Sequence, residues 1–370
     1  MQRDFHYYAT YCAAYLAGYS HEESEEIAYS AALVDFCSAT LLKELGGPAD
    51  AATTQLQMEM MDMPGDRYGR QEITRIWASF HFLPYDLHAR VKGGRRYRDK
   101  YRMICNTNSD LLVETVQLAK EASLQAAGIA MHVLADTWAH RYFAGTPSLV
   151  INNTNYHFYE DVPEGDEVKL RRVTFRHSTS KPDDIENGIY TNTIYQMIED
   201  SVMNLGHGRA GHLPDYSFVK YRYLPAWAEY EEYVKDNPAE FLQAFRQMVY
   251  ALKYLRGEYP EFEKEVYDTE SVDPYAVEID RFLRVRRTDS DLGWKTLGEQ
   301  LSGKGLPEFR MDRHFDEYRA AAEKDETVLG RFFAAAIRQK QMVSLRIMES
   351  GNRIVTLRKK RRRIREGADV

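Results

Sequence analysis

Three polar residues recur at every fourth position of one apolar segment. His132, Asp136 and His140 lie in the sequence HVLADTWAH. Because an α-helix has 3.6 residues per turn, positions i, i+4 and i+8 project from nearly the same face. A carboxylate between two imidazoles can bridge two metal ions. The surrounding segment is apolar nearly all round, so these groups need a metal or close pairing inside a core. The row predicts a metal-binding helix rather than a polar surface.

Single His and Asp residues also interrupt other apolar segments. His6 lies in an aromatic-rich first segment two residues after Asp4, Asp35 interrupts AALVDFC, and His81 lies in WASFHFLP. A buried carboxylate is costly without a cation or strong hydrogen bonds. Each residue alone fits a hydrogen-bonded core position equally well, but their recurrence favours one shared interior site.

A glycine-rich segment, LGHGRAGHLPDY, carries three more candidates, His207, His212 and Asp215. Its glycines allow the backbone to approach a metal or ligand closely. A second pair, His157 and Asp161, is spaced four apart in NYHFYED. Both sets are candidate additional ligands.

The elements that must position these residues are expected to be helices. The spacing of apolar residues predicts helices over 5–17, from Ser20 to about Leu45 with a Ser20–Glu23 capping box, and over 110–143. Further helices are expected over 189–204, 238–256, 274–286, 291–302 and 315–349. Residues 146–188 have almost no helical period and are expected to form a long loop insertion with a small hairpin. The predicted fold class is all-α, with a helical metal-binding domain over 1–310 and a C-terminal helical extension over 311–370.

Composition narrows the function classes. The formal charge of −7 argues against a general nucleic-acid binder, although seven basic residues gather between Arg358 and Arg365. This basic tail is a candidate contact for anionic lipid or nucleic acid.

The cysteines and the N-terminal sequence indicate the cellular location. Three widely spaced cysteines fit neither a disulfide framework nor a CxxC metal motif. Together with the absence of a signal-peptide pattern and of a long apolar span, they predict a cytoplasmic protein. The GxSxG, Walker A and HExxH motifs are absent, and no GxGxxG motif follows an expected strand.

The order His6, Asp35, His81, His132-x-x-x-Asp136 and His140 resembles the ligand order of the zinc-dependent phospholipase C and P1-nuclease superfamily. More closely, the DFHYYATY, FHFLP, MHVLADTWAH and GHG motifs resemble an uncharacterised bacterial family placed near that superfamily. The resemblance covers about residues 1–260. It implies a multi-helix bundle that holds two or three Zn²⁺ ions.

The resemblance also implies a set of ligands. Asp35, His81, His132 and Asp136 would hold one zinc ion, and Asp136 would bridge to a second ion that His6 helps to hold. Asp35 and Asp136 are then the expected catalytic carboxylates.

A third ion would involve His140, and here the sequence departs from the superfamily. No HxxxE pair follows at the expected place, so either His207 with Asp215 or His157 with Asp161 would substitute, with His212 as a further candidate. Superfamily members also use the amino group of their first residue, a role that would fall here to Met1 or Asp4.

The function implied is a zinc-dependent phosphoesterase in which a metal-activated water attacks a phosphodiester. Arg141 and Arg209, each next to a candidate ligand, are expected to contact the phosphate of a small-molecule, lipid or nucleotide substrate. One alternative is a non-catalytic helical scaffold whose metals have closed coordination spheres. Another is an HD-like phosphohydrolase acting on nucleotides, because a helical site of separated His and Asp residues would have a similar composition, although no HD dipeptide occurs.

Overall fold

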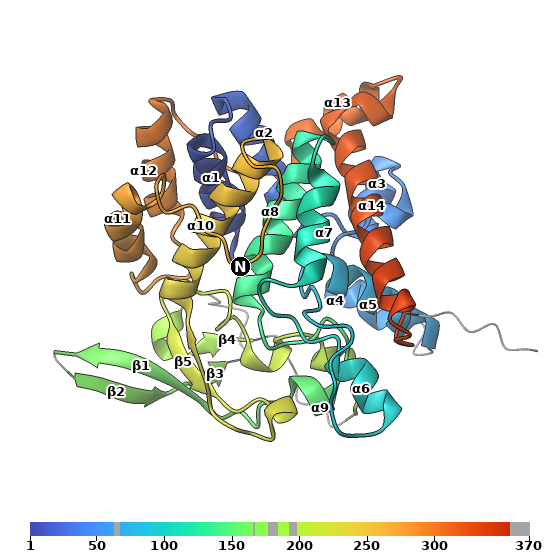
Figure 1. The fold of residues 1–370 in the computed structure, drawn as a ribbon, viewed down its shortest axis with the longest axis vertical. Helices are drawn as coiled ribbons and strands as arrows, with labels where there is room; N and C mark the ends of the chain where they lie inside the picture. The colour runs from blue at the N-terminus through green and yellow to red at the C-terminus, as the bar shows by residue number, and fades with distance from the viewer. Residues whose placement is uncertain (63–66, 166, 177–183, 192–197, 356–370) are drawn as a thin grey trace, which may run out of the picture.

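A central helix organises the molecule. The computed structural model describes residues 1–62, 67–165, 167–176, 184–191 and 198–355. Helices make up 54% of it, and α8 (Leu124–Ala139) contacts α2, α5, α7, α10 and α14. The strands lie at one end of this bundle (Figure 1). The helix that carries the row of candidate ligands is therefore the core of the bundle, and its C-terminal end faces the strands.

Local sequence signals set the ends of the first helices. These are η1 (Phe5–Ala9, a π-helical turn), α1 (Thr10–Leu16), α2 (His21–Leu33), α3 (Ala39–Leu45), α4 (Gln57–Asp62), α5 (Arg67–Phe80) and α6 (Arg95–Tyr101). The capping box is confirmed, because the side chains of Ser20 and Glu23 each accept the other's backbone N–H. The helix expected to run to Leu45 is interrupted after α2, and Asp35 lies in the turn.

The segment 110–143 forms two helices instead of one. α7 spans Asp110–Ala119, and α8 begins after Ser123, whose side chain accepts a backbone N–H of the first turn. Between them Glu121 adopts a φ of 56°. The prediction of one continuous helix was wrong because apolar spacing runs across the break, whereas the Ser123 cap starts a new helix.

The C-terminal helices share the core of the N-terminal ones. They are α10 (Asn237–Leu255), α11 (Asp273–Leu283), α12 (Asp291–Ser302), α13 (Phe315–Ala320) and α14 (Val328–Glu349). Phe332 and Val343 of α14 belong to the same apolar cluster as Phe5 and Leu134. The domain boundary at 310 stays a prediction, and the residues described on its two sides pack into one core.

Two sheets correct the expected all-α fold class. A four-stranded antiparallel sheet has the order β2-β1-β5-β6, and a second sheet pairs β3 with β4 in parallel. The strands are β1 (Phe158–Glu164), β2 (Glu167–Arg172), β3 (Phe175–Arg176), β4 (Ile189–Tyr190), β5 (Lys220–Tyr223) and β6 (Tyr233–Asp236). The structure is therefore mixed α and β, and the all-α prediction was wrong. β3 to β6 have four residues or fewer, which is too short for a strand period to stand out in the sequence.

The insertion 146–188 contains the expected hairpin, β1 with β2, and a short helix α9 (Leu149–Asn152). The helix expected over 189–204 was wrong in the part described, where β4 and a 3₁₀ turn at Val202–Asn204 are found. Phe158, Tyr221 and Tyr223 of the sheet pack with Phe82 into a second apolar cluster. The sheet is thus joined to the segment that follows α5.

Two further expectations concern the cysteines and the membrane. Cys12, Cys37 and Cys105 are all buried and free. None of the described helices combines the length and the apolar character needed to cross a bilayer. The basic tail between Arg358 and Arg365 lies outside the described residues.

Candidate metal centre

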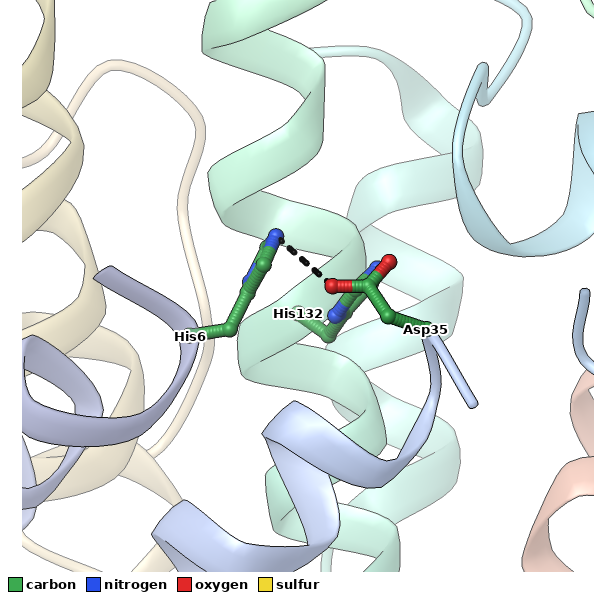
Figure 2. Close-up of side chains that lie close together, drawn as sticks. All are labelled: His6, Asp35 and His132. Carbon is green, nitrogen blue, oxygen red and sulfur yellow. Dashed lines mark ion pairs between the residues drawn. The ribbon is translucent and has the colours of Figure 1, made fainter. Parts of the chain in front are cut away.

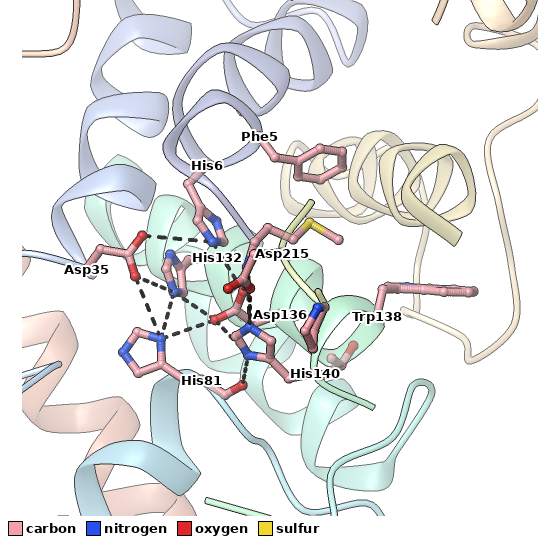
Figure 3. Close-up of polar contacts among 12 residues, drawn as sticks. Phe5, His6, Asp35, His81, His132, Asp136, Trp138, His140 and Asp215 are labelled. Atoms are coloured by element: carbon pink, nitrogen blue, oxygen red, sulfur yellow. Dashed lines mark hydrogen bonds and ion pairs between the residues drawn. The ribbon is translucent and has the colours of Figure 1, made fainter. Parts of the chain in front are cut away.

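The row of residues on α8 lies inside the molecule. His132 and Asp136 are on α8 and His140 is its C-cap, and their exposed fractions are 0%, 1% and 5%. The helical spacing brings all three to the same side, where His6, Asp35, His81 and Asp215 meet them (Figure 3). Asp136 lies in the middle, with histidines around both of its carboxylate oxygens.

The first group of ligand atoms surrounds Asp136 Oδ2. His81 Nδ1 lies 3.1 Å and His132 Nε2 3.2 Å from this oxygen, and the two nitrogens are 3.3 Å apart. Asp35 Oδ1 is 3.9 Å from both nitrogens. Zinc bonds of about 2.0–2.1 Å in a tetrahedron place ligand atoms roughly 3.3 Å apart. The spacing of the His81, His132 and Asp136 atoms therefore fits a single ion, whereas Asp35 lies close to both His6 and His132 in a second group.

Backbone carbonyls fix which imidazole nitrogens face this centre. A carbonyl only accepts, so His132 Nδ1 donates to Ala31 O at 2.9 Å and His81 Nε2 donates to Thr53 O at 3.1 Å. In a neutral ring the other nitrogen then carries a lone pair. The two lone pairs and the Asp136 carboxylate face one another, and a cation between them would satisfy all three.

A second group forms around the other oxygen of Asp136. His6, on η1, stacks on His132 with ring centroids 3.8 Å apart, and its Nε2 lies 3.2 Å from Asp136 Oδ1 and 4.0 Å from Asp35 Oδ2. Figure 2 shows His6 and His132 beside Asp35. Both His6 nitrogens are fully buried and make no hydrogen bond within the described structure. The Met1 amino group also lies 2.7 Å from Asp136 Oδ1. A buried imidazole that faces two carboxylates and has no hydrogen-bond partner is well suited to hold a metal.

A third group decides between the two alternative pairs. His140 Nε2 lies 3.0 Å from Asp215 Oδ1, and His207 Nε2 lies 3.6 Å from Asp215 Oδ2. His140 Nδ1 donates to His81 O at 2.7 Å and His207 Nδ1 to Gly211 O at 2.8 Å, so the same carbonyl arrangement directs both inner nitrogens. These ligand atoms lie close enough to share one ion.

The glycine-rich segment needs its glycines for this placement. Gly206 and Gly211 have φ values of 53° and 55°, and a Cβ on Gly206 would lie 2.2 Å from the Phe82 ring. Phe82 in turn stacks on His140 with centroids 4.7 Å apart. His212 Nδ1 lies 3.4 Å from Asp215 Oδ2 at the edge of the group.

Electrostatics favour the metal-binding protonation states of most of these groups. Asp35 and the Met1 amino group differ, because burial raises the pKa of Asp35 and neighbouring carboxylates, against the effect of burial, raise that of the amino group to about 10. Burial lowers the pKa of His6, His132 and His207 to about 4, so these rings are neutral at pH 7. Burial opposes the ionisation of Asp136 and Asp215, yet neighbouring histidines and the Met1 amino group hold both pKa values well below the usual range. Neutral imidazoles beside ionised carboxylates are the forms that coordinate a cation.

The remaining candidates lie outside this group of ligands. Asp4 accepts the Ser290 N–H at 2.6 Å, and burial raises its pKa to about 7. His157 contacts the Tyr159 ring, and Asp161 pairs with Arg222 at 2.7 Å. Of the alternative pairs, the structure therefore brings His207 and Asp215 to His140.

The two arginines expected to contact phosphate are engaged elsewhere. Arg141 lies 3.5 Å from Glu240 and contacts the Tyr142 hydroxyl. Arg209 is 1% exposed and donates to Asn204 Oδ1 at 2.8 and 3.0 Å.

The sequence did not indicate that the carbonyls of Ala31, Thr53 and His81 accept hydrogen bonds from the histidines. Every residue type has a backbone carbonyl, so no residue type marks these positions. It also missed a cavity of about 220 Å³ beside the third group. Trp77, Phe82 and His207 line this cavity together with Met203 and Leu205, and no charged side chain lines it. The sequence signal that could have indicated this cavity is Trp77, an aromatic residue four positions before His81. The ring centroids of Trp77 and His81 are 5.0 Å apart.

Fold and centre together define a mixed α and β protein in which the central helix and four other segments build a largely buried centre of histidines and aspartates. The chain belongs to the family of unknown function DUF6765, whose model matches residues 1–347. No curated protein and no solved structure matches the chain. The resemblance to the phospholipase C and P1-nuclease superfamily stays a prediction.

Proposed function

We propose that this protein is a metal-dependent phosphoesterase that hydrolyses a phosphodiester through a metal-activated water. The observation that carries the proposal is the presence of three neighbouring groups of possible metal ligands, which are His6 with Asp35 and His132, His81 with His132 and Asp136, and His140 with His207 and Asp215. The fully buried His6 ring makes no hydrogen bond in the described structure and lies beside Asp136. Groups of this composition are costly to bury without a cation.

Two or three zinc ions fit the donor set. The groups are made of imidazole nitrogens and carboxylate oxygens, which suit zinc, and the cysteines lie outside all three groups. Asp35, His81, His132 and Asp136 would hold one ion. His6 with Asp136 and the Met1 amino group would hold a second, and His140 with His207 and Asp215 a third. When bound, such ions lower the pKa of a coordinated water towards 7 and neutralise charge on a phosphate ester.

The protein's own residues orient this chemistry. The carbonyls of Ala31 and Thr53 hold the His132 and His81 rings, so their inner nitrogens keep a fixed direction. Arg141 and Arg209 have partners of their own, which leaves the neutralisation of phosphate to the metal site. Asp35 and Asp136, the expected catalytic carboxylates, act in this proposal as ligands.

An open side supports an enzyme over a closed scaffold. The Asp35 side chain is 33% exposed, although the other first-group ligands are almost fully buried. A cavity reaches His207 from another direction. A purely structural metal site closes its coordination sphere with protein ligands, whereas a catalytic one keeps a position for water and substrate.

Hydrolysis of bis-p-nitrophenyl phosphate tests the proposal. The zinc-loaded protein should release p-nitrophenolate, and a chelator should abolish the activity until zinc is restored. Asp35→Asn should reduce the rate at least tenfold, whereas Asp161→Asn, which lies at the Arg222 pair, should not. Zinc-loaded protein that is inactive on this diester, and on the monoester p-nitrophenyl phosphate, would favour a metal-stabilised scaffold.

The substrate is proposed to be a small phosphate ester, a lipid or a nucleotide. An apolar cavity beside the third group would accept the organic part of such an ester. A cytoplasmic location, and contact of the basic tail with anionic lipid or nucleic acid, stay predictions.

A further inference from the structure

A second cavity lies near the N-terminal end of α5, away from the metal centre. Its volume is about 350 Å³, and Thr74 and Thr146 form part of its wall. Arg70 on this wall and His81 at the metal centre are eleven positions apart along the helical chain, which is roughly 16 Å at 1.5 Å per residue. The cavity is therefore separate from the site proposed to be catalytic.

The wall of this cavity is strongly basic. Its charged lining residues are Arg70, Arg95, Arg96, Lys100 and Arg353 against Asp99 and Asp200. The lining therefore has an excess of three positive charges, or two when Glu199, the partner of Lys100, is counted, in a chain whose formal charge is −7. A local concentration of cations opposite in sign to the whole molecule is typical of a specific anion site rather than of general charge.

The carboxylate of Asp200 interacts with three of these cations. Asp200 lies 2.6 Å from both Lys100 Nζ and Arg96, and Arg70 also acts on it, so its pKa falls below the usual range although burial opposes this shift. Lys100 is 7% exposed and has Glu199 as a second partner at 2.6 Å. A buried lysine held in this way is a fixed positive charge that does not depend on a flexible surface side chain.

The positions of these residues are set by three separate segments. Arg95, Arg96 and Lys100 lie on α6, which Asn352 ties to the C-terminal segment by donating to Asp99 O at 2.7 Å. Arg70 lies on α5, and Asp200 precedes the 3₁₀ turn at 202–204. The cavity is thus built by tertiary contacts and does not belong to one charged helix.

We infer that this cavity binds a small molecule that carries adjacent phosphate groups. Arginine side chains bind phosphate through two parallel N–H groups, and a lysine supplies a point charge beside them. The volume is within the range of small-ligand pockets, about 300–1,000 Å³, which suits a diphosphate group better than a polymer. The inference is independent of the phosphoesterase proposal.

Titration calorimetry with inorganic pyrophosphate at constant ionic strength tests this site. The wild-type protein should bind pyrophosphate saturably, and Arg95→Gln with Arg96→Gln should weaken binding at least tenfold. Arg281→Gln with Arg310→Gln removes the same charge at exposed positions outside the cavity lining and should leave binding unchanged.

Two controls separate this binding from other causes. The Arg95→Lys and Arg96→Lys variant, which keeps both charges, should retain most of the affinity, and circular dichroism should show the same fold in all variants. Zinc at the metal centre would also attract pyrophosphate, but that binding would be the same in the Arg95→Gln and Arg96→Gln variant. Equal affinity in this variant and the wild type, or no saturable binding at millimolar pyrophosphate, would overturn the inference.

Discussion

At the scale of single residues, the direction of each histidine matters more than its presence. Four histidines, His81, His132, His140 and His207, each donate one ring nitrogen to a backbone carbonyl and present the other to a carboxylate. This arrangement fixes the tautomer and the ring plane before any ion arrives. The centre is therefore preorganised for a metal by the main chain.

Replacing the central carboxylate tests this view. Asp136→Asn removes the charge that both His81 and His6 face, so we expect at least a tenfold weaker affinity for zinc. Equilibrium dialysis with a competing zinc chelator measures the change. Asp161→Asn is the matched control at a pair outside the centre. Wild-type zinc affinity in a folded Asp136→Asn protein would contradict the assignment of the ligands.

The low pKa of the buried histidines gives a pH dependence with a definite sign. His132 and His207 titrate at about 4 in the folded protein and near 6.5 when unfolded. The unfolded chain therefore binds more protons at these rings between these values, so the histidines lower folding stability as the pH drops from 6.5 towards 4. Asp4, whose pKa burial raises to about 7, contributes in the opposite direction, and the buried histidines outnumber it. The melting temperature of chelator-treated protein should decrease across this interval. The decrease should be smaller in His207→Gln, and a flat profile in the wild type would contradict the burial of neutral imidazoles.

Much of the centre could be predicted from residue spacing. His132, Asp136 and His140 follow from helical periodicity, and His6, Asp35 and His81 from their apolar surroundings, all of which the structure brings together. The choice between His207 with Asp215 and His157 with Asp161 could not be made, because it depends on which loop folds against the end of α8. Spacing along the chain contains no information on that contact.

At the scale of elements, the close approach of α2 and α8 sets the centre. Gly128 of α8 lies against α2, where an added Cβ would be 2.5 Å from Ile27 O and 2.6 Å from Ser30 Cβ. This approach brings Ala31 O within reach of His132. A single glycine thus controls both helix packing and the direction of a ligand.

We therefore expect Gly128→Ala to separate the two helices. Steric overlap with the α2 backbone should destabilise the protein by about 1–3 kcal/mol, even though alanine favours helix. Urea unfolding measures the change, and zinc affinity should fall with it. Gly305→Ala is the matched control, since a Cβ there meets no atom within 4 Å. Unchanged stability of Gly128→Ala would show that α2 and α8 can separate freely.

Helix positions were more predictable than helix breaks or strands. The capping box at Ser20 and Pro238 in the first turn of α10 are local sequence signals, and each lies at the start of an observed helix. The break at Ser123 and the pairing of β1 with β5 were missed. Phe158 pairs with Tyr223, 65 positions later, and such long-range pairing leaves little trace in a local pattern.

At the scale of the whole molecule, the centre joins segments that are distant in sequence. Its ligands come from η1, the turn after α2, the end of α5, α8 and the turn that contains Asp215. A bound metal would therefore stabilise the folded state as a whole, because the unfolded chain does not bring these ligands together.

Removal of metal should accordingly lower stability. Addition of a chelator should reduce the melting temperature by several degrees at pH 7, and zinc in excess should restore it in a concentration-dependent way. Differential scanning calorimetry measures both changes, with Asp136→Asn as the comparison that should respond less, because the third group does not contain Asp136. The same shift in that variant would place the stabilising metal elsewhere.

The metal content of the purified protein tests the central claim most directly. Inductively coupled plasma mass spectrometry should find two or three zinc ions per chain in the wild type, and fewer in His132→Ala and His207→Ala. Protein that binds no transition metal, even after dialysis against zinc, would contradict the metal centre and the function proposed for it.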